Sequence, residues 1–173
     1  MKQHRRKSIR LPGYDYSQAG WYFVTICTGD RECRFGYVVD GHIRCTALGR
    51  LVKGCWRQIP KHFKNVSLDV FAIMPNHIHG IIVIHDFPVG TRHALSLQRR
   101  YQTLPSVIGS FKSSVSRKMR SLSFDGFRWQ RSYNDHVIRH EASFRKIRHY
   151  IVNNARKWDL DRDNPTNFRR YGS

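Results

Sequence analysis

The chain has 173 residues, a length that fits one domain with a hydrophobic core. Its composition, 40% hydrophobic and 13% aromatic, excludes an intrinsically disordered chain. Lys and Arg together number 31 against 12 Asp and Glu, and the resulting net charge of +19 favours a polyanionic partner. Nucleic acid fits better than a membrane surface, because the sequence has no long apolar span and no apolar segment behind its basic start. A basic protein without such a partner is the less specific alternative.

The first thirteen residues form a basic arm that ends in Pro-Gly and lacks a core pattern. We expect its Arg5 and Arg6 to contact nucleic acid. The four cysteines are widely spaced and form no C-x-x-C pair. Together with the expected absence of a signal peptide, this spacing predicts a cytoplasmic protein with reduced thiols, and neither a disulfide framework nor a zinc knuckle.

The first half of the chain predicts strands, a hairpin and a helix. Residues 21–28 are aromatic and β-branched, as in a strand. Asp40-Gly41, in the middle of residues 36–45, predicts a two-residue hairpin because both turn positions accept positive φ. Thr46 is a good cap for a helix over residues 47–59, whose apolar side chains fall on one face. That helix is predicted to cover a sheet.

Two further strands are predicted at residues 66–74 and 77–85, followed by a polar connector over 86–100. The next helix begins at Thr103 or Ser106 and has one apolar face. On the rest of its surface lie basic side chains that we expect to face phosphate, namely Lys112, Arg117 and Lys118.

Residues 127–139 predict a strand pair or a single returning strand, and residues 141–158 the last helix. The order of elements is that of an α+β fold with helices packed on an antiparallel sheet. We therefore divide the chain into the arm at 1–13, a single domain at 14–160 and a tail at 161–173.

His77 and His79 are the first candidates for chemistry. In a strand, alternate side chains share a face, so both imidazoles point the same way while Ile78 points to the other side. Two imidazoles placed in this way can hold one metal ion. The motif alone is weak, because a chain with ten histidines forms an H-x-H pattern by chance at close to this frequency. Two hydrogen-bonded structural histidines are the alternative.

The last predicted helix places Tyr150 and Asn154 one turn apart, beside its apolar stripe. Docked on the sheet, the helix would aim a phenol and an amide oxygen at the same point. The alternative is a boundary tyrosine whose ring packs while its hydroxyl stays in water.

Four stretches of the sequence, in this order along the chain, resemble the single-tyrosine HUH transposases, and most closely the branch associated with repetitive extragenic palindromes. These stretches are PNHIHGIIVI (75–84), SVIGSFKSSVSRKMR (106–120), WQRSYNDHVIR (129–139) and FRKIRHYIVNNARKW (144–158). With the aromatic strand at 21–28, they span most of the chain. H-x-H alone is unspecific, whereas the four stretches together are specific.

The resemblance implies a ferredoxin-like core and a role for each matching residue. His77 and His79 match the HUH histidines, Tyr150 matches the nucleophile, and Asn154 matches the polar residue that completes the metal site. Ala155 is a departure, because many relatives have Asn-Pro there; the change alters helix stiffness and removes no functional group.

The implied activity is cleavage and rejoining of single-stranded DNA that contains a hairpin. The Tyr150 phenol would attack phosphorus and form a 5′-phosphotyrosine, leaving a free 3′-hydroxyl. A divalent metal, Mg²⁺ or Mn²⁺, would polarise the scissile phosphate. Relatives exist as monomers and as homodimers, so either state is open, as is the target sequence.

His136 lies in a family-like segment, and we expect it to orient a partner or face DNA, although a structural role is equally open. Two other functions remain possible. In one, the protein binds nucleic acid without catalysis, through its basic and aromatic surface. In the other, it is a zinc-dependent hydrolase built on His77 and His79, for which the sequence lacks an obvious third histidine or glutamate base.

Overall fold

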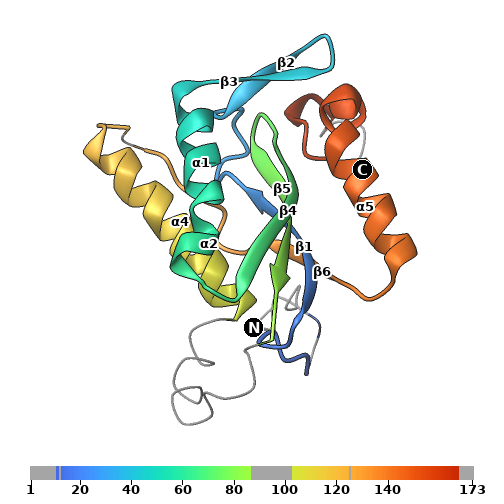
Figure 1. The fold of residues 1–173 in the computed structure, drawn as a ribbon. Helices are drawn as coiled ribbons and strands as arrows, with labels where there is room; N and C mark the ends of the chain where they lie inside the picture. Colours follow the sequence, from blue (N-terminus) through green and yellow to red (C-terminus); the bar gives the residue numbers. More distant parts are fainter. Residues whose placement is uncertain (1–10, 12, 87–102, 125, 168–173) are drawn as a thin grey trace, which may run out of the picture.

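A four-stranded antiparallel sheet lies at the centre of the computed structural model, which describes residues 11, 13–86, 103–124 and 126–167 (Figure 1). Its strands follow the spatial order β4-β5-β1-β6. Their bounds are β1 Gly20–Cys27, β4 Val66–Ile73, β5 His77–Ile84 and β6 Asn134–Ile138. Every neighbouring pair is antiparallel, and a bulge interrupts the β4–β5 register between Leu68 and Phe71.

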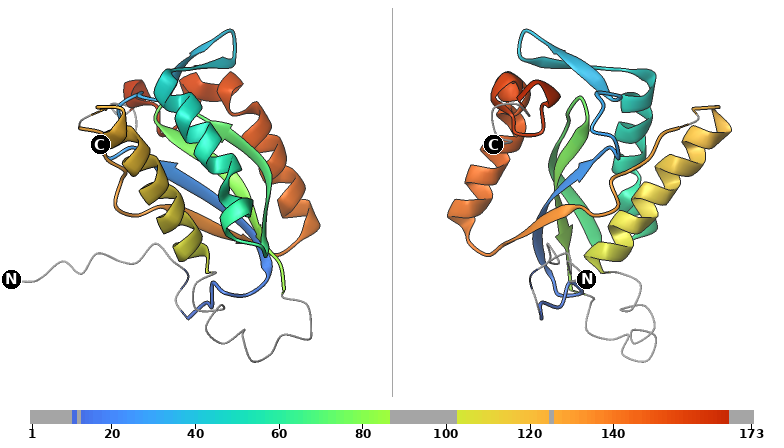
Figure 2. Two further views of the ribbon diagram at one scale, coloured as in Figure 1. Left: turned by 60° about the vertical axis from the view of Figure 1, so that its left-hand side comes forward. Right: turned by 180° about the vertical axis from the view of Figure 1, so that it is seen from behind.

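Helices cover both faces of this sheet (Figures 1 and 2). Helix α1 (Ala47–Arg57), followed by the short α2 (Ile59–His62), connects β1 to β4, and α4 (Leu104–Ser121) connects β5 to β6. These crossover helices lie on one face, while α5 (Glu141–Asn153) lies on the opposite face. The strand order and the two crossovers make a ferredoxin-like core, as the sequence analysis predicted.

The hairpin forms where the sequence predicts it, from β2 (Gly36–Val39) and β3 (His42–Cys45). Its turn residues Asp40 and Gly41 have φ values of 50° and 70°, which explains the need for this dipeptide. Thr46 caps α1 by accepting a hydrogen bond from the Gly49 amide at 3.1 Å. The hairpin therefore leads directly into the helix that covers the sheet.

The hydrophobic core is unequally divided between the two faces. On the α1 and α4 side, large side chains from both helices and the sheet are buried in one continuous cluster, among them Trp56, which is fully buried. Gly80 of β5 makes room for this indole, because a Cβ there would overlap the ring. On the α5 side, the hydrophobic cluster has three buried members among the described residues, Ile81, Ile138 and Ile151.

Two predicted elements end differently in the structure. Within residues 127–139 there is one strand, β6, and an isolated bridge between Thr28 and Trp129. The last α-helix does not continue to Trp158: it ends at Asn153, and the chain continues as the 3₁₀ helix η1 (Ala155–Leu160). The apolar stripe extended the prediction too far, because the residues beyond Asn153 turn more tightly as a 3₁₀ helix, with the Trp158 ring 6.0 Å from the His77 ring between centroids.

Residues 161–167, assigned to the tail in the sequence analysis, pack back on the domain through η2 (Pro165–Asn167). Asn164 and Asn167 are buried, and their side-chain amides donate to the carbonyl oxygens of Trp158 and Asp159. Three parts of the chain lie outside the described residues: most of the basic arm, residues 87–100 of the connector, and residues 168–173. No helix in the described part of the chain has the length and apolar character needed to cross a membrane.

Candidate functional site

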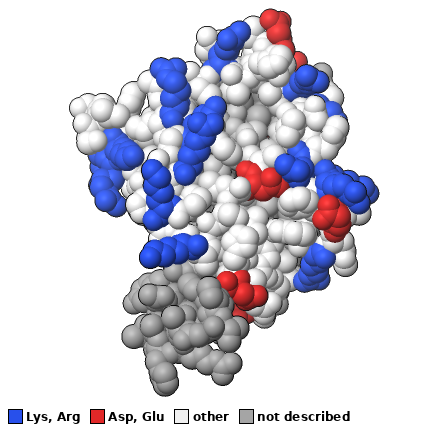
Figure 3. Space-filling view, in the orientation of Figure 1, with Lys and Arg blue, Asp and Glu red and all other residues white. Residues whose placement is uncertain are grey.

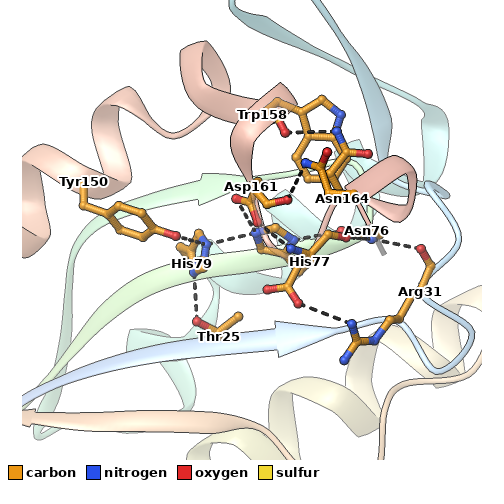
Figure 4. Close-up of polar contacts among 11 residues, drawn as sticks. Thr25, Arg31, Asn76, His77, His79, Tyr150, Trp158, Asp161 and Asn164 are labelled. Carbon is orange, nitrogen blue, oxygen red and sulfur yellow. Dashed lines mark hydrogen bonds and ion pairs between the residues drawn. The ribbon is translucent and has the colours of Figure 1, made fainter. Parts of the chain in front are cut away.

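An open pocket of about 520 Å³ lies on the α5 side of the sheet, next to the small apolar cluster. Its walls come from strands β1, β5 and β6, from α5, from η1 and from residues 161–163 that follow it. The residues that carry its polar atoms include Thr25, His79, His136, Tyr150, Asn154 and Asp161. Figure 4 shows how the polar side chains at its inner end point toward one another.

His77 and His79 share one face of β5, as the strand period predicts, while Ile78 is buried in the core on the other side. Both imidazoles are almost fully buried, and their Nε2 atoms are 2.9 Å apart. Burial lowers the pKa of His77 to about 3 and that of His79 well below its usual range. Both rings are therefore neutral at pH 7 and offer lone pairs.

Asn76 determines which nitrogen of His77 carries the lone pair. Its Nδ2 donates to the carbonyl oxygens of Arg31 and Asp163, at 2.9 and 2.7 Å, which identifies the other side-chain atom as the acceptor Oδ1. That Oδ1 lies 2.8 Å from His77 Nδ1, so Nδ1 is the protonated nitrogen. His77 Nε2 is then free to accept a proton or bind a metal ion.

His79 faces three partners at once. Its Nδ1 lies 2.9 Å from Thr25 Oγ1, while its Nε2 faces both His77 Nε2 and, at 3.2 Å, the Tyr150 hydroxyl (Figure 4). If His79 Nε2 carries a proton it can donate to His77, but it cannot then accept from Tyr150. A cation at this point would satisfy both imidazole lone pairs, so the nitrogen donors fit a metal ion.

Tyr150 reaches the histidines from α5 while its side chain remains open to the pocket, with 43% of its surface exposed. Burial of the hydroxyl raises the pKa of Tyr150, the charge of Asp161 raises it further, and a hydrogen bond with Asn154 opposes the rise. Asn154 itself is buried, and its Oδ1 has no hydrogen-bond partner among the described residues. A buried acceptor without a donor fits a cation ligand.

Asp161 is a candidate metal ligand that sequence reasoning missed, as it missed the supporting residues Asn76 and Thr25. Its carboxylate oxygen lies 4.0 Å from His77 Nε2, and one potential ligand atom each from His77, His79 and Asp161 lie within 4.8 Å of one another. Burial raises the pKa of Asp161, while a hydrogen bond from the Asp163 amide, at 2.7 Å, opposes the rise. The available signal was the Asp159, Asp161, Asp163 alternation in a chain with only 12 acidic residues.

The other predicted residues lie at different distances from this centre. His136 is exposed on the edge strand β6 and lines the pocket. Arg117 and Lys118 are exposed on α4, on the opposite side of the sheet, and Lys112 Nζ donates to the carbonyl oxygens of residues 130–132 at 2.8 to 3.4 Å. Arg5 and Arg6 lie outside the described residues. The surface view shows many Lys and Arg side chains and few acidic ones (Figure 3).

Comparison with known proteins places this site in a recognisable fold. No family model matches the sequence. An uncharacterized protein of Haemophilus influenzae is 41% identical over 167 residues, which cover 91% of this chain and 92% of the relative. The structure of a REP-associated tyrosine transposase bound to a REP hairpin superposes with a TM-score of 0.58 at 16% identity, covering 91% of this chain and 74% of that one. The chain therefore belongs to the family of the Haemophilus influenzae protein and has the fold of a REP-associated tyrosine transposase.

Proposed function

We propose that the protein is a transposase-like endonuclease that cleaves and rejoins single-stranded DNA through a covalent bond to Tyr150. The observation that carries the proposal is the 3.2 Å contact between the Tyr150 hydroxyl and His79, which places a phenol at a buried pair of neutral imidazoles in an open pocket. A nucleophile, metal-binding donors and solvent access meet there.

In the proposed reaction, the Tyr150 oxygen attacks the scissile phosphorus. The new bond joins the phenol oxygen to phosphorus, the bond to the 3′-oxygen breaks, and the phenol proton is ultimately transferred to that oxygen. The raised pKa of Tyr150 means that the phenol is protonated at pH 7, so attack needs a proton acceptor. The Asp161 carboxylate lines the same pocket, and one of its two oxygens can accept the proton while the other binds the ion; His79 Nε2 contacts the phenol but is assigned to the ion. The phosphotyrosine conserves the bond energy, so rejoining needs no ATP.

His77, His79 and Asn154 are the proposed ligands of a divalent metal ion, and Asp161 is added to this set because of its position. Mixed nitrogen and oxygen donors suit Mn²⁺, or Mg²⁺ at its cellular abundance. When bound, such an ion polarises the phosphate as a Lewis acid. The protein's own contribution is to hold the donors in place: Asn76 orients His77, and Thr25 contacts His79.

Single-stranded DNA with a hairpin is the proposed substrate. The net charge of +19 supports a polyanionic partner, and the solved structure with this fold is bound to a REP hairpin. The described pocket opens to solvent beside His136 and Tyr150, which permits an extended strand to enter. A monomer and a homodimer both remain compatible with this proposal.

The test is incubation of the full-length protein with hairpin DNA from the flanks of its own gene, with Mn²⁺ or Mg²⁺, followed by a denaturing gel. Wild type should form a covalent adduct, and Tyr150→Phe should form none. Tyr37→Phe is the matched control, because Tyr37 is an exposed tyrosine away from the pocket and its variant should still form the adduct. Binding without an adduct in wild type would favour a non-catalytic binding protein, and cleavage without an adduct a metal-dependent hydrolase.

A further inference from the structure

The helix that carries the proposed nucleophile carries a further reactive group on the same face. Tyr150 and Asn154 lie one α-helical turn apart, and Lys157 follows three residues later in the 3₁₀ helix η1, where its amide donates to the Asn154 carbonyl oxygen at 2.9 Å. Side chains three residues apart in a 3₁₀ helix lie one above the other. All three residues line the same pocket. Helix α5 and its continuation therefore present a phenol, an amide and an ammonium group in a row.

The ammonium group of Lys157 is available for a ligand. The residue is exposed, and its side chain forms no ion pair within the part of the chain that the structure describes. Among the described residues that line the pocket, Arg162 is the other permanent cation. The two differ in chemistry, because a guanidinium keeps its protons in proteins whereas an ammonium can release one. Lys157 is therefore the cation of this pocket that can act as an acid.

The proposed cleavage needs an acid as well as a base. When the Tyr150 oxygen attacks phosphorus, the bond to the 3′-oxygen breaks, and an alkoxide leaves far more readily if it receives a proton as it departs. The attacking and leaving oxygens lie roughly in line on opposite sides of the phosphorus. A group close enough to take the phenol proton, the role given above to Asp161, is on the attacking side. A different group must therefore serve the leaving oxygen.

The order of the groups along the helix matches this in-line order. Four residues of α-helix and three of 3₁₀ helix separate Tyr150 from Lys157 by about 12 Å along the helix axis. Both side chains are long and line the pocket, which leaves room for one phosphate group between the phenol and the ammonium. Asn154, a proposed metal ligand, lies between the two residues on the helix. A phosphate bound beside Asn154 would have the phenol on one side and the ammonium on the other.

We propose that Lys157 is the general acid that protonates the leaving 3′-oxygen. In cleavage, the electron pair of the broken phosphorus–oxygen bond stays on the 3′-oxygen, which takes a proton from Lys157 Nζ, while the Asp161 carboxylate takes the phenol proton. In rejoining, the neutral amine takes the proton of the attacking 3′-hydroxyl, and Asp161 returns its proton to the departing phenol. Both groups thereby regain their starting states. This assignment rests on the function proposed above and adds the acid to its base.

The test replaces the leaving oxygen by sulfur. Hairpin DNA with sulfur in place of the 3′-oxygen, at the phosphate that wild type cleaves, releases a thiolate, which is a much weaker base than an alkoxide and leaves without an acid. Covalent adduct formation is timed on denaturing gels for oxygen DNA and for sulfur DNA, with whichever of Mn²⁺ or Mg²⁺ supports cleavage by wild type. The full-length variants are Lys157→Met and Lys157→Arg, the second of which keeps the charge and cannot release the proton. Lys64→Met is the control, an exposed lysine outside the pocket.

On oxygen DNA, both Lys157 variants should form the adduct about 10²- to 10⁴-fold more slowly than wild type, because general acid catalysis is lost. On sulfur DNA, both should come within about tenfold of wild type, because the lost proton is no longer needed. Lys64→Met should match wild type on both. His136→Gln removes the exposed imidazole on the β6 wall of the same pocket, and any loss it causes should be equal on the two DNAs.

An equal loss on both DNAs in the Lys157 variants would make Lys157 a phosphate-binding group and overturn the assignment. An unchanged rate on oxygen DNA, or rescue by sulfur in His136→Gln and not in the Lys157 variants, would overturn it as well. Wild type that forms no adduct with either DNA contradicts the proposed function and the acid together. Wild type that forms the adduct, beside Lys157 variants that sulfur does not rescue, contradicts the acid alone.

Discussion

The two faces of the central sheet have opposite characters. The face covered by α1 and α4 is a continuous apolar layer around Trp56. Under α5, the apolar cluster has three buried members among the described residues, and two buried histidines and a buried asparagine lie beside it. Buried polar groups cost stability unless each finds a partner, so the chain concentrates its apolar burial on one face and keeps the other for chemistry. The fold is therefore stabilised mainly by the face under α1 and α4. The rigid packing of that face holds the side chains of the candidate site in place on the other.

The largest expected effect comes from the apolar face. Replacing Trp56 by Ala should lower the free energy of unfolding by about 3–5 kcal/mol, because the fully buried indole packs against Phe71 and Phe111 and its loss leaves a cavity. Phe144→Ala, on the half-buried side of α5, is the comparison and should cost less than half as much. Urea unfolding measures the free energy of unfolding of both variants. Equal losses would contradict the unequal apolar burial on the two faces.

Asn76→Ala should have the next largest effect, on two measurements. It leaves His77 Nδ1 and the carbonyl oxygens of Arg31 and Asp163 without their partner, which costs about 1–3 kcal/mol in the free energy of unfolding. Mn²⁺ affinity in calorimetric titrations should fall by about 10- to 100-fold, because His77 loses its orienting acceptor. Asn153→Ala is the control, since the described side-chain contacts of Asn153 are with His149 alone. Unchanged Mn²⁺ affinity in Asn76→Ala would refute the orienting role.

The polar face should also make the metal-free protein acid-sensitive. Burial lowers the pKa of His77 to about 3 and that of His79 well below normal, while both titrate near 6.5 in the unfolded chain. Between these values the unfolded chain binds more protons, so the free energy of unfolding should fall as the pH drops below 6.5. The raised pKa of Asp161 acts in the opposite direction at lower pH. Unfolding in EDTA from pH 4.5 to 8 measures the slope, and a His77→Gln/His79→Gln variant with the same slope would exclude this cause.

The smallest expected effect on stability belongs to Tyr150→Phe. The ring remains and the lost hydroxyl is partly exposed, so the free energy of unfolding should change by no more than about 0.5 kcal/mol. Tyr16→Phe is the matched case, because the Tyr16 hydroxyl is buried, donates to Asp135 at 2.6 Å and accepts from the Leu11 amide at 3.1 Å. Thermal melts should give a lower melting temperature for Tyr16→Phe than for Tyr150→Phe. A Tyr150→Phe cost as large as that of Tyr16→Phe would make Tyr150 a structural residue.

Local patterns were sufficient to predict most of the fold. The hairpin follows from the Asp40-Gly41 turn, the start of α1 from Thr46, and the shared face of His77 and His79 from the period of a strand. Each of these features depends on residues that are neighbours in sequence, and for that reason each can be predicted from the sequence alone.

The features that sequence missed depend on distant contacts. The residues that follow Asn154 turn as a 3₁₀ helix and bring Asp161 back to the histidines, which no local pattern encodes. Asn76 acquires its role only because Arg31 and Asp163 meet beside it. Lys112 was expected to face phosphate from its position on a helix surface, but its Nζ is engaged by the returning chain, and its nucleic-acid role stays a prediction.

Mass spectrometric mapping of the covalent adduct tests the central claim most directly. Wild-type protein is incubated with hairpin DNA and Mn²⁺, the adduct is isolated under denaturing conditions, and nuclease and trypsin are used to reduce it to a peptide with its attached nucleotide. The account predicts a 5′-phosphotyrosine on the tryptic peptide 149–156, at Tyr150, its only tyrosine. A nucleotide attached to any other residue, or full binding of the DNA with no modified peptide, would contradict it.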